Sequence, residues 1–161
     1  MKKALLVLFA CLALPLHAAD FTPLDRHAAQ RLLDPSSYRQ PTVVTLWSSD
    51  CSYCKQNLQL LSVLIKRHKN LRVITVAAES ESAALAPLLA RFELPGPRYV
   101  YGNDSPEAIA HAIDPTWAGE LPRSYLFNGS GGKAKVSGVI GETVLEQTLL
   151  LPRTTGKNGY I

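Results

Sequence analysis

The chain has 161 residues, 47% of them hydrophobic and 19% charged, with a formal net charge of +4 and three cysteines. This length and apolar content suit a single globular domain with a core of its own. The basic side chains are scattered along the chain rather than gathered in a stripe, so the positive charge does not indicate nucleic-acid binding.

The N-terminal segment has the layout of a signal peptide. Two lysines follow the first residue, residues 4–16 form an apolar run, and small residues stand at Ala18 and Ala19. The run is shorter than the roughly 20 apolar residues that cross a bilayer, so the pattern predicts export to the periplasm and not a membrane span. We expect cleavage after Ala18, which removes residues 1–18 and lowers the net charge to +2 because both lysines are lost.

Cys11 lies inside the signal peptide and would be lost with it. The alternative is that Cys11 is a lipidation site, but Phe9 fits that pattern poorly and the apolar run continues beyond the cysteine. Removal of Cys11 leaves Cys51 and Cys54 as the two cysteines of the exported chain. They would work in an oxidising compartment, where disulfide chemistry is expected.

The domain, residues 19–151, is predicted to alternate helices and strands, and a polar, flexible tail follows at residues 152–161. Runs of β-branched residues indicate the first strands, and the strand core at residues 73–76 has the character of a strand buried on both faces. Helical spacing, capping residues and turns place the other elements. In chain order we expect a helix at 24–33, a strand at 42–47, a helix at 51–69, a strand at 71–77, a helix from Ser80 or Ser82 to Phe92 that Pro87 interrupts, a strand at 98–101, a helix at 105–113, a hairpin of strands 124–127 and 133–139, and a helix at 142–151.

Two cysteines stand where the strand at 42–47 leads into the next helix, in the sequence Trp-Ser-Ser-Asp-Cys-Ser-Tyr-Cys-Lys of residues 47–55. Free backbone N–H groups and the positive end of the helix dipole favour a thiolate at such a junction. We therefore expect Cys51 to be the exposed nucleophile and Cys54, a turn further on, to close a disulfide with it. The motif predicts a redox site.

A CxxC pair has other uses in proteins. It could form a structural disulfide or half of a metal site, but zinc takes four ligands and the sequence has no second cysteine pair. A copper-handling module would need a histidine beside Cys51 and Cys54. The only methionine is Met1, which counts against copper delivery. We expect the histidines after residue 20 to be solvated or to cap helices, so no metal or other cofactor is predicted.

The order of elements, with the cysteine pair at a strand–helix junction, resembles the thioredoxin fold, and its details resemble the TlpA-like periplasmic thioredoxins. The matching features are Trp47 ahead of the Cys-Ser-Tyr-Cys-Lys motif, an inserted region at about residues 79–113, and a proline-containing segment at 119–127 before a glycine turn. The resemblance covers about residues 24–151. It implies an α/β fold with a mixed central sheet flanked by helices and a TlpA-type central strand–helix insertion. It also implies a cis Leu121-Pro122 bond that faces the cysteine pair.

The resemblance further implies thiol–disulfide exchange with other proteins. The expected activity is the reduction of disulfides in extracytoplasmic proteins by Cys51 and Cys54, with a membrane dithiol as the electron donor. Leu121 and Pro122 would present backbone groups to a strand of the substrate. Four further residues would support the site: Trp47, Ser52, Tyr53 and Lys55.

The direction of exchange has an alternative. Ser52 and Tyr53 between the cysteines differ from the Gly-Pro of strong reductases and resemble the Gly-Tyr of periplasmic isomerases, so a disulfide oxidase or isomerase stays open. Asp50 opposes a thiolate on Cys51, whereas Lys55 and the helix dipole favour it.

The chain departs from the family in the acid that manages the proton of the buried cysteine. Asn57 and Thr45 stand at the two positions where thioredoxin-like proteins place an acid, and neither side chain accepts a proton at neutral pH. We expect Glu79, Glu81 or a water to take this role, or the resolving step to be slow.

Overall fold

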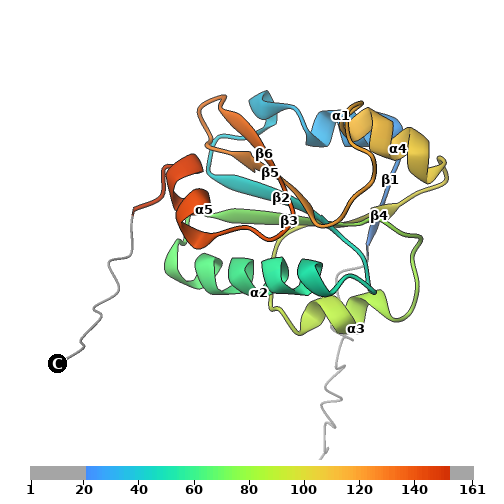
Figure 1. The fold of residues 1–161 in the computed structure, drawn as a ribbon, viewed down its shortest axis with the longest axis horizontal. Helices are drawn as coiled ribbons and strands as arrows, with labels where there is room; N and C mark the ends of the chain where they lie inside the picture. Colours follow the sequence, from blue (N-terminus) through green and yellow to red (C-terminus); the bar gives the residue numbers. More distant parts are fainter. Residues whose placement is uncertain (1–20, 153–161) are drawn as a thin grey trace, which may run out of the picture.

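The computed structural model describes residues 21–152 (Figure 1). The signal peptide, the alternative lipidation site at Cys11 and all but the first residue of the expected tail lie outside the described residues. The elements in chain order are β1 (Thr22–Leu24), α1 (Arg26–Leu32), a short 3₁₀ helix (Pro35–Ser37), β2 (Thr42–Trp47), α2 (Ser52–Arg67), β3 (Arg72–Ala77), α3 (Leu85–Ala90), β4 (Arg98–Tyr101), α4 (Pro106–Ile113), β5 (Arg123–Phe127), β6 (Lys133–Ser137) and α5 (Glu142–Thr148).

The strands form one six-stranded sheet in the order β1-β4-β3-β2-β5-β6. The pairs from β1 to β2 are parallel, whereas β5 is antiparallel to both β2 and β6. Helices α2, α3 and α5 cover one face of the sheet, and α1 and α4 cover the other (Figure 1). The expected α/β fold, with a mixed sheet flanked by helices, is confirmed.

Each face of the sheet has its own apolar core, and β2 contributes to both. Val43 and Trp47 pack against α2 on one side, while Val44 and Leu46 pack toward α1 and α4 on the other. All six residues of β2 are buried, because this strand lies inside the sheet and helices cover both of its faces. Between residues 21 and 152, no helix is long and apolar enough to cross a membrane.

Most predicted elements form with small shifts at their ends. The strand at 42–47 has the predicted bounds, and β4 also matches. Strand β6 stops at Ser137 because Gly138 leaves the extended conformation with a φ of +83°. Helix α5 stops at Thr148, three residues before the predicted end.

Two expectations, for the segment of β1 and for the start of α3, are wrong, and each has a physical reason. The three residues of β1 were not expected to form a strand, and they do so by parallel pairing with β4, more than 70 residues away in sequence. Helix α3 begins at Leu85, after Ala84 and not after Ser80 or Ser82. Pro87 is therefore the third residue of the helix, where its missing N–H costs no intrahelical bond, so it does not interrupt the helix.

Candidate active site

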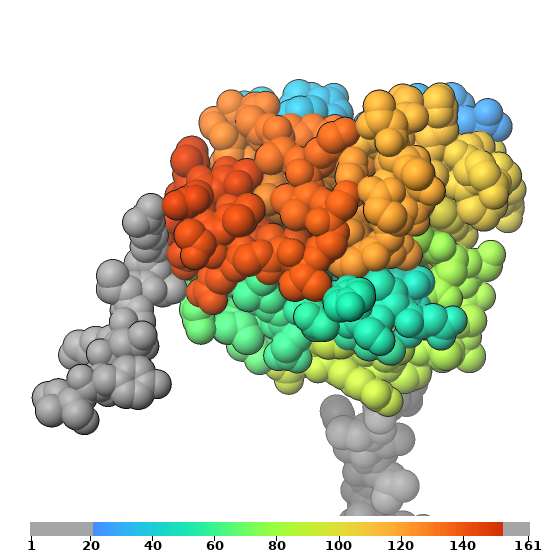
Figure 2. All heavy atoms as spheres, viewed as in Figure 1, coloured from blue at the N-terminus to red at the C-terminus, as the bar shows by residue number. Residues whose placement is uncertain are grey.

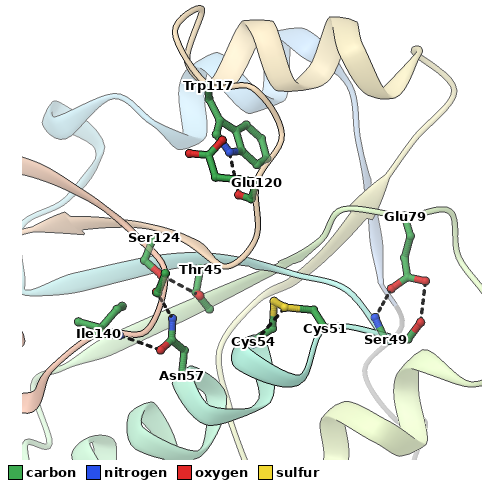
Figure 3. The surroundings of a disulfide bond; sticks show 11 residues. Thr45, Ser49, Cys51, Cys54, Asn57, Glu79, Trp117, Glu120, Ser124 and Ile140 are labelled. Atoms are coloured by element: carbon green, nitrogen blue, oxygen red, sulfur yellow. Dashed lines mark hydrogen bonds between the residues drawn. A yellow bond between two sulfur atoms is a disulfide. The ribbon is translucent and has the colours of Figure 1, made fainter.

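Cys51 and Cys54 form a disulfide at the start of α2, with an S–S distance of 2.05 Å and a Cα–Cα distance of 5.2 Å (Figure 3). Cys51 is the N-cap residue of α2, and its Sγ accepts a hydrogen bond of 3.1 Å from the backbone N–H of Cys54. In the dithiol form the same N–H and the positive end of the helix dipole would stabilise a thiolate on Cys51. The two sulfurs therefore differ in their local geometry.

The two cysteines also differ in their exposure to solvent. Cys51 is half-buried, whereas the Cys54 side chain is fully buried in the apolar core between the sheet and α2. An incoming sulfur can reach Cys51 from solvent and cannot reach Cys54 without movement of the protein. This asymmetry suits a pair in which one thiol attacks and the other resolves.

The predicted support residues lie around the pair in different ways. Trp47 is fully buried in the same apolar core as Cys54, and its indole Nε1 has no hydrogen-bond partner among the described residues. Ser52 and Tyr53 are exposed, and Tyr53 leaves 63% of its surface open to solvent. Lys55 is half-buried. Tyr53 is thus an aromatic contact surface directly beside the cysteines.

The Leu121-Pro122 peptide bond is cis, as the resemblance implies. Pro122 is buried and leads directly into β5, where Arg123 pairs with Leu46 of β2. The pairing brings the loop before β5 and the cysteine loop after β2 to the same end of the sheet. Figure 2 shows the orange segment that follows α4 lying directly against the teal start of α2.

The polar groups around the disulfide are divided into two sets (Figure 3). On the Cys54 side, the Thr45 and Ser124 hydroxyls share a hydrogen bond of 2.9 Å. Asn57 lies on the same side, donates to the Gly138 carbonyl at 3.1 Å and accepts from the Ile140 N–H at 3.0 Å. All of these groups are neutral, and Asn57 holds the segment before α5 against α2.

One of the two acids expected to accept the Cys54 proton, Glu79, lies on the Cys51 side of the disulfide. The Glu79 carboxylate accepts hydrogen bonds from the Ser49 N–H at 2.5 Å and the Ser49 hydroxyl at 3.0 Å, and Ser49 belongs to the loop before Cys51 (Figure 3). Glu81 is exposed. Of the two candidate proton acceptors, Glu79 is the one held against the cysteine loop, on the Cys51 side of the disulfide.

An ionic network behind the cis proline was missed by the sequence analysis. Arg123, buried in β5, donates to Asp114 at 2.7 Å and to the Tyr125 hydroxyl at 3.2 Å, and its guanidinium also contacts Glu120 and Ser137. Asp114 and Arg123 flank the loop that carries the cis proline, so their ion pair ties the two ends of this loop together. The sequence shows an arginine at the start of an apolar strand, but it does not indicate which acidic residue pairs with that arginine.

Trp117 lies within this loop and is 7% exposed. Its indole Nε1 donates to the Glu120 carbonyl at 2.9 Å, and its ring packs in the core beneath α4. In the described part of the chain, no group of three or more His, Cys, Asp and Glu side chains is arranged to hold a metal ion.

Several solved structures are similar to this chain in fold. The chain is similar to a secreted Mycobacterium tuberculosis disulfide oxidoreductase described as homologous to E. coli DsbE, at 15% identity and a TM-score of 0.57 over 71% of this chain and 84% of that one. It is also similar to a thioredoxin-family thiol:disulfide interchange protein of Chlorobium tepidum, at 13% identity and a TM-score of 0.55 over 75% and 82% of the two chains. A thioredoxin-like protein solved in its oxidised form shares 20% identity and a TM-score of 0.53 over 80% and 83%.

No family model and no curated protein matches the sequence. At these identities the similarity is one of fold. The resemblance to thioredoxin-fold thiol–disulfide oxidoreductases, inferred above from the residues, is confirmed at that level.

Replacement of Asn57 tests its role in holding the segment before α5. Asn57→Ala leaves the Gly138 carbonyl and the buried Ile140 N–H without their partners, so we expect it to lower the free energy of unfolding by about 2–4 kcal/mol. Gln56→Ala, at an exposed position on the same helix, should change it by less than about 0.5 kcal/mol. Urea denaturation measures both, and equal effects of the two variants would contradict the role.

The Asp114 carboxylate predicts a pH dependence of stability. Burial raises the pKa of Asp114, but hydrogen bonds from Thr116, Lys135 and Arg123 outweigh it and hold the pKa well below its ordinary value. The folded state therefore prefers the ionised form, and this stabilisation is present above the unfolded pKa of about 3.9 and is lost as the pH falls toward the lower folded pKa.

We expect Asp114→Asn to lower the free energy of unfolding at pH 7 by about 1–4 kcal/mol, because the buried Arg123 loses its shorter ion pair and keeps only the longer one with Glu120. The difference from the parent protein should shrink below about pH 4. Glu93→Gln, which breaks an exposed pair with Lys66, should cost less than about 1 kcal/mol. Denaturant titrations at several pH values measure this, and a difference that grows in acid would contradict the assignment.

Proposed function

We propose that the chain is an exported thiol–disulfide oxidoreductase that reduces disulfides of extracytoplasmic proteins through Cys51 and Cys54. The observation that carries the proposal is the asymmetric pair: a half-buried Cys51 that caps a helix N-terminus and a fully buried Cys54 bonded to it, beside a cis proline. The thioredoxin-like fold supports the same reading.

The reaction transfers two electrons to the substrate. The Cys51 thiolate attacks one sulfur of the substrate disulfide, and the other substrate sulfur leaves as a thiolate that takes up a proton. Cys54 loses its proton and attacks the Cys51 sulfur, which closes the Cys51–Cys54 disulfide and releases the second substrate sulfur. The substrate gains two electrons and two protons, and the protein loses them.

The surroundings of the pair support substrate binding. The Leu121-Pro122 segment would pair with an extended segment of the substrate through the backbone of Leu121, since Pro122 has no N–H and its carbonyl accepts from the Gly138 N–H at 2.9 Å. Exposed Ser52 and Tyr53 would contact the same segment. Trp47 would hold the site from below, within the core that contains Cys54. Lys55 would offset part of the negative charge near the thiolate.

Export and a membrane electron donor complete the proposal. Residues 1–18 would direct the domain, residues 19–151, to the periplasm. A reductant outside the cytoplasm is consumed by each turnover, so a membrane dithiol must return two electrons to the Cys51–Cys54 disulfide. The similar protein of Mycobacterium tuberculosis is described as secreted.

Charge near the pair favours a reductant over an oxidase or isomerase. A strong oxidant owes its potential to a stabilised dithiol form, in which the nucleophile is a thiolate. Asp50 is exposed beside Cys51 and destabilises that thiolate, and the groups on the Cys54 side are neutral. Asp50 therefore favours the disulfide form and lowers the reduction potential, and the neutral groups on the Cys54 side supply no positive charge that would oppose this effect.

The reduction potential of the pair decides the direction. Equilibration with dithiothreitol and glutathione buffers, read by thiol alkylation of the protein with Cys11→Ser, should give a value near or below about −250 mV. Asp50→Asn should raise it by about 10–30 mV, because the thiolate loses a repulsive neighbour, whereas Glu93→Gln should not move it. A parent value of about −120 to −180 mV would assign an oxidase or isomerase instead.

Single-cysteine variants test which sulfur attacks. In the Cys11→Ser background, Cys54→Ser should accumulate a mixed disulfide with a peptide disulfide, since the resolving thiol is gone. Cys51→Ser should accumulate far less, because Cys54 is fully buried. Mass spectrometry after acid quenching measures both, and equal trapping by the two variants would show that the order of attack is wrong.

A further inference from the structure

A groove of about 500 Å³ opens at the carboxyl ends of β3 and β4. Its walls are apolar and come from the ends of these strands, from α4 and from the loop before the cis proline: Ala78, Tyr101, Ala110, Trp117, Ala118 and Leu121. Tyr101 and Trp117 are themselves buried and form a rigid aromatic part of the lining. A groove of this size can take one or two apolar side chains but no folded domain.

The groove does not include the cysteines, but two of its lining residues, Ala78 and Leu121, connect it to the redox site. Ala78 follows β3, and its N–H donates to the Trp47 carbonyl at 2.8 Å, just ahead of the cysteine loop. Leu121 forms the other junction, because it packs against both the core that contains Cys54 and the core beneath Trp117. Figure 3 shows the loop with Trp117 and Glu120 standing above the disulfide. An extended chain bound at the disulfide thus has an apolar groove within reach.

The groove has a negative rim. Glu107 lines it from α4, is exposed, and has no hydrogen bond or ion pair among residues 21–152. Asp50 is likewise exposed at the cysteines. Glu79 and Glu120, in contrast, already bond to Ser49 and to Ser137. His111 lies one turn after Glu107 on the same rim.

We propose that this groove binds an apolar side chain of the substrate polypeptide close to its target cysteine, and that Glu107 selects a basic residue beside that side chain. The inference rests on the proposed function and adds the substrate class: unfolded or extended segments that are apolar and cationic around a disulfide-bonded cysteine. The chemistry is carried out at the start of α2, while selection takes place on α4 and the loop before the cis proline.

Symmetric peptide disulfides test the proposal, since both of their sulfurs are equivalent. Each peptide has one cysteine, with Leu or Ser two positions away and Lys or Glu next to that residue. Rates of reduction by the reduced protein with Cys11→Ser are measured at pH 8 and divided by the rate with 2-hydroxyethyl disulfide, which is too small to reach the groove. We expect Leu to exceed Ser by about tenfold and Lys to exceed Glu by about threefold.

Groove variants locate these preferences. Ala110→Leu fills the groove and should reduce the advantage of Leu to less than about twofold. Ala108→Leu, the same change on the same helix outside the groove, should leave it intact. Ala118→Leu, at an exposed position of the loop, gives a second filling variant if the first does not fold. Glu107→Gln should abolish the preference for Lys, whereas Glu93→Gln should not.

The outcomes separate this proposal from the proposed function. Equal rates for the Leu and Ser peptides, or an advantage that survives both filling variants, would overturn the groove proposal while leaving the oxidoreductase intact. Failure of the reduced protein to react with 2-hydroxyethyl disulfide would overturn the proposed function itself. Loss of the Leu advantage in the filling variants alone, with loss of the Lys preference in Glu107→Gln alone, supports the proposal.

Discussion

The placement of β2 between β3 and β5 is the constraint on which the site depends. Parallel pairing with β3 matches Trp47 to Ala77, and antiparallel pairing with β5 matches Leu46 to Arg123. Three loops therefore meet at one end of the sheet: the cysteine loop after β2, the Glu79 loop after β3 and the cis-proline loop before β5. Complete burial of β2 on both faces fixes this register, since a one-residue slip would exchange the side chains of its two cores.

The disulfide separates two electrostatic environments. Carboxylates lie toward Cys51, with Asp50 in the preceding position and Glu79 bonded to the same loop, whereas Cys54 faces hydroxyl and amide groups. A thiolate on Cys51 is thus stabilised by the Cys54 N–H and the helix terminus but opposed by neighbouring charge. The groups described on the Cys54 side are two hydroxyls and the Asn57 amide, and none of them accepts a proton at neutral pH.

Local signals were enough to predict the parts of the site that lie close together in sequence. The strand at 42–47, the cysteine helix and the helix at 105–113 follow from residue pattern alone, and each formed close to its expected bounds. The prediction of a cis bond before Pro122 depended on the family resemblance alone. The groove, the Asp114–Arg123 pair and β1 could not be predicted, because each depends on which distant segments meet. Asn57 was recognised as a non-acid, but its bonds to the segment before α5 needed the structure.

Separation of the groove from the cysteines has a consequence for specificity. The reduction potential depends on groups within a few ångströms of the sulfurs, such as Asp50 and the Cys54 N–H, and none of these lies on α4. Residues of α4 and of the loop held by Asp114 and Arg123 can therefore change substrate preference with little effect on the potential. The Asp114–Arg123 ion pair affects both substrate preference and the surroundings of the cysteines. The loop that it closes carries Leu121, which packs against the core that contains Cys54 and also lines the groove. Loosening that loop should weaken substrate recognition before it alters the exchange chemistry.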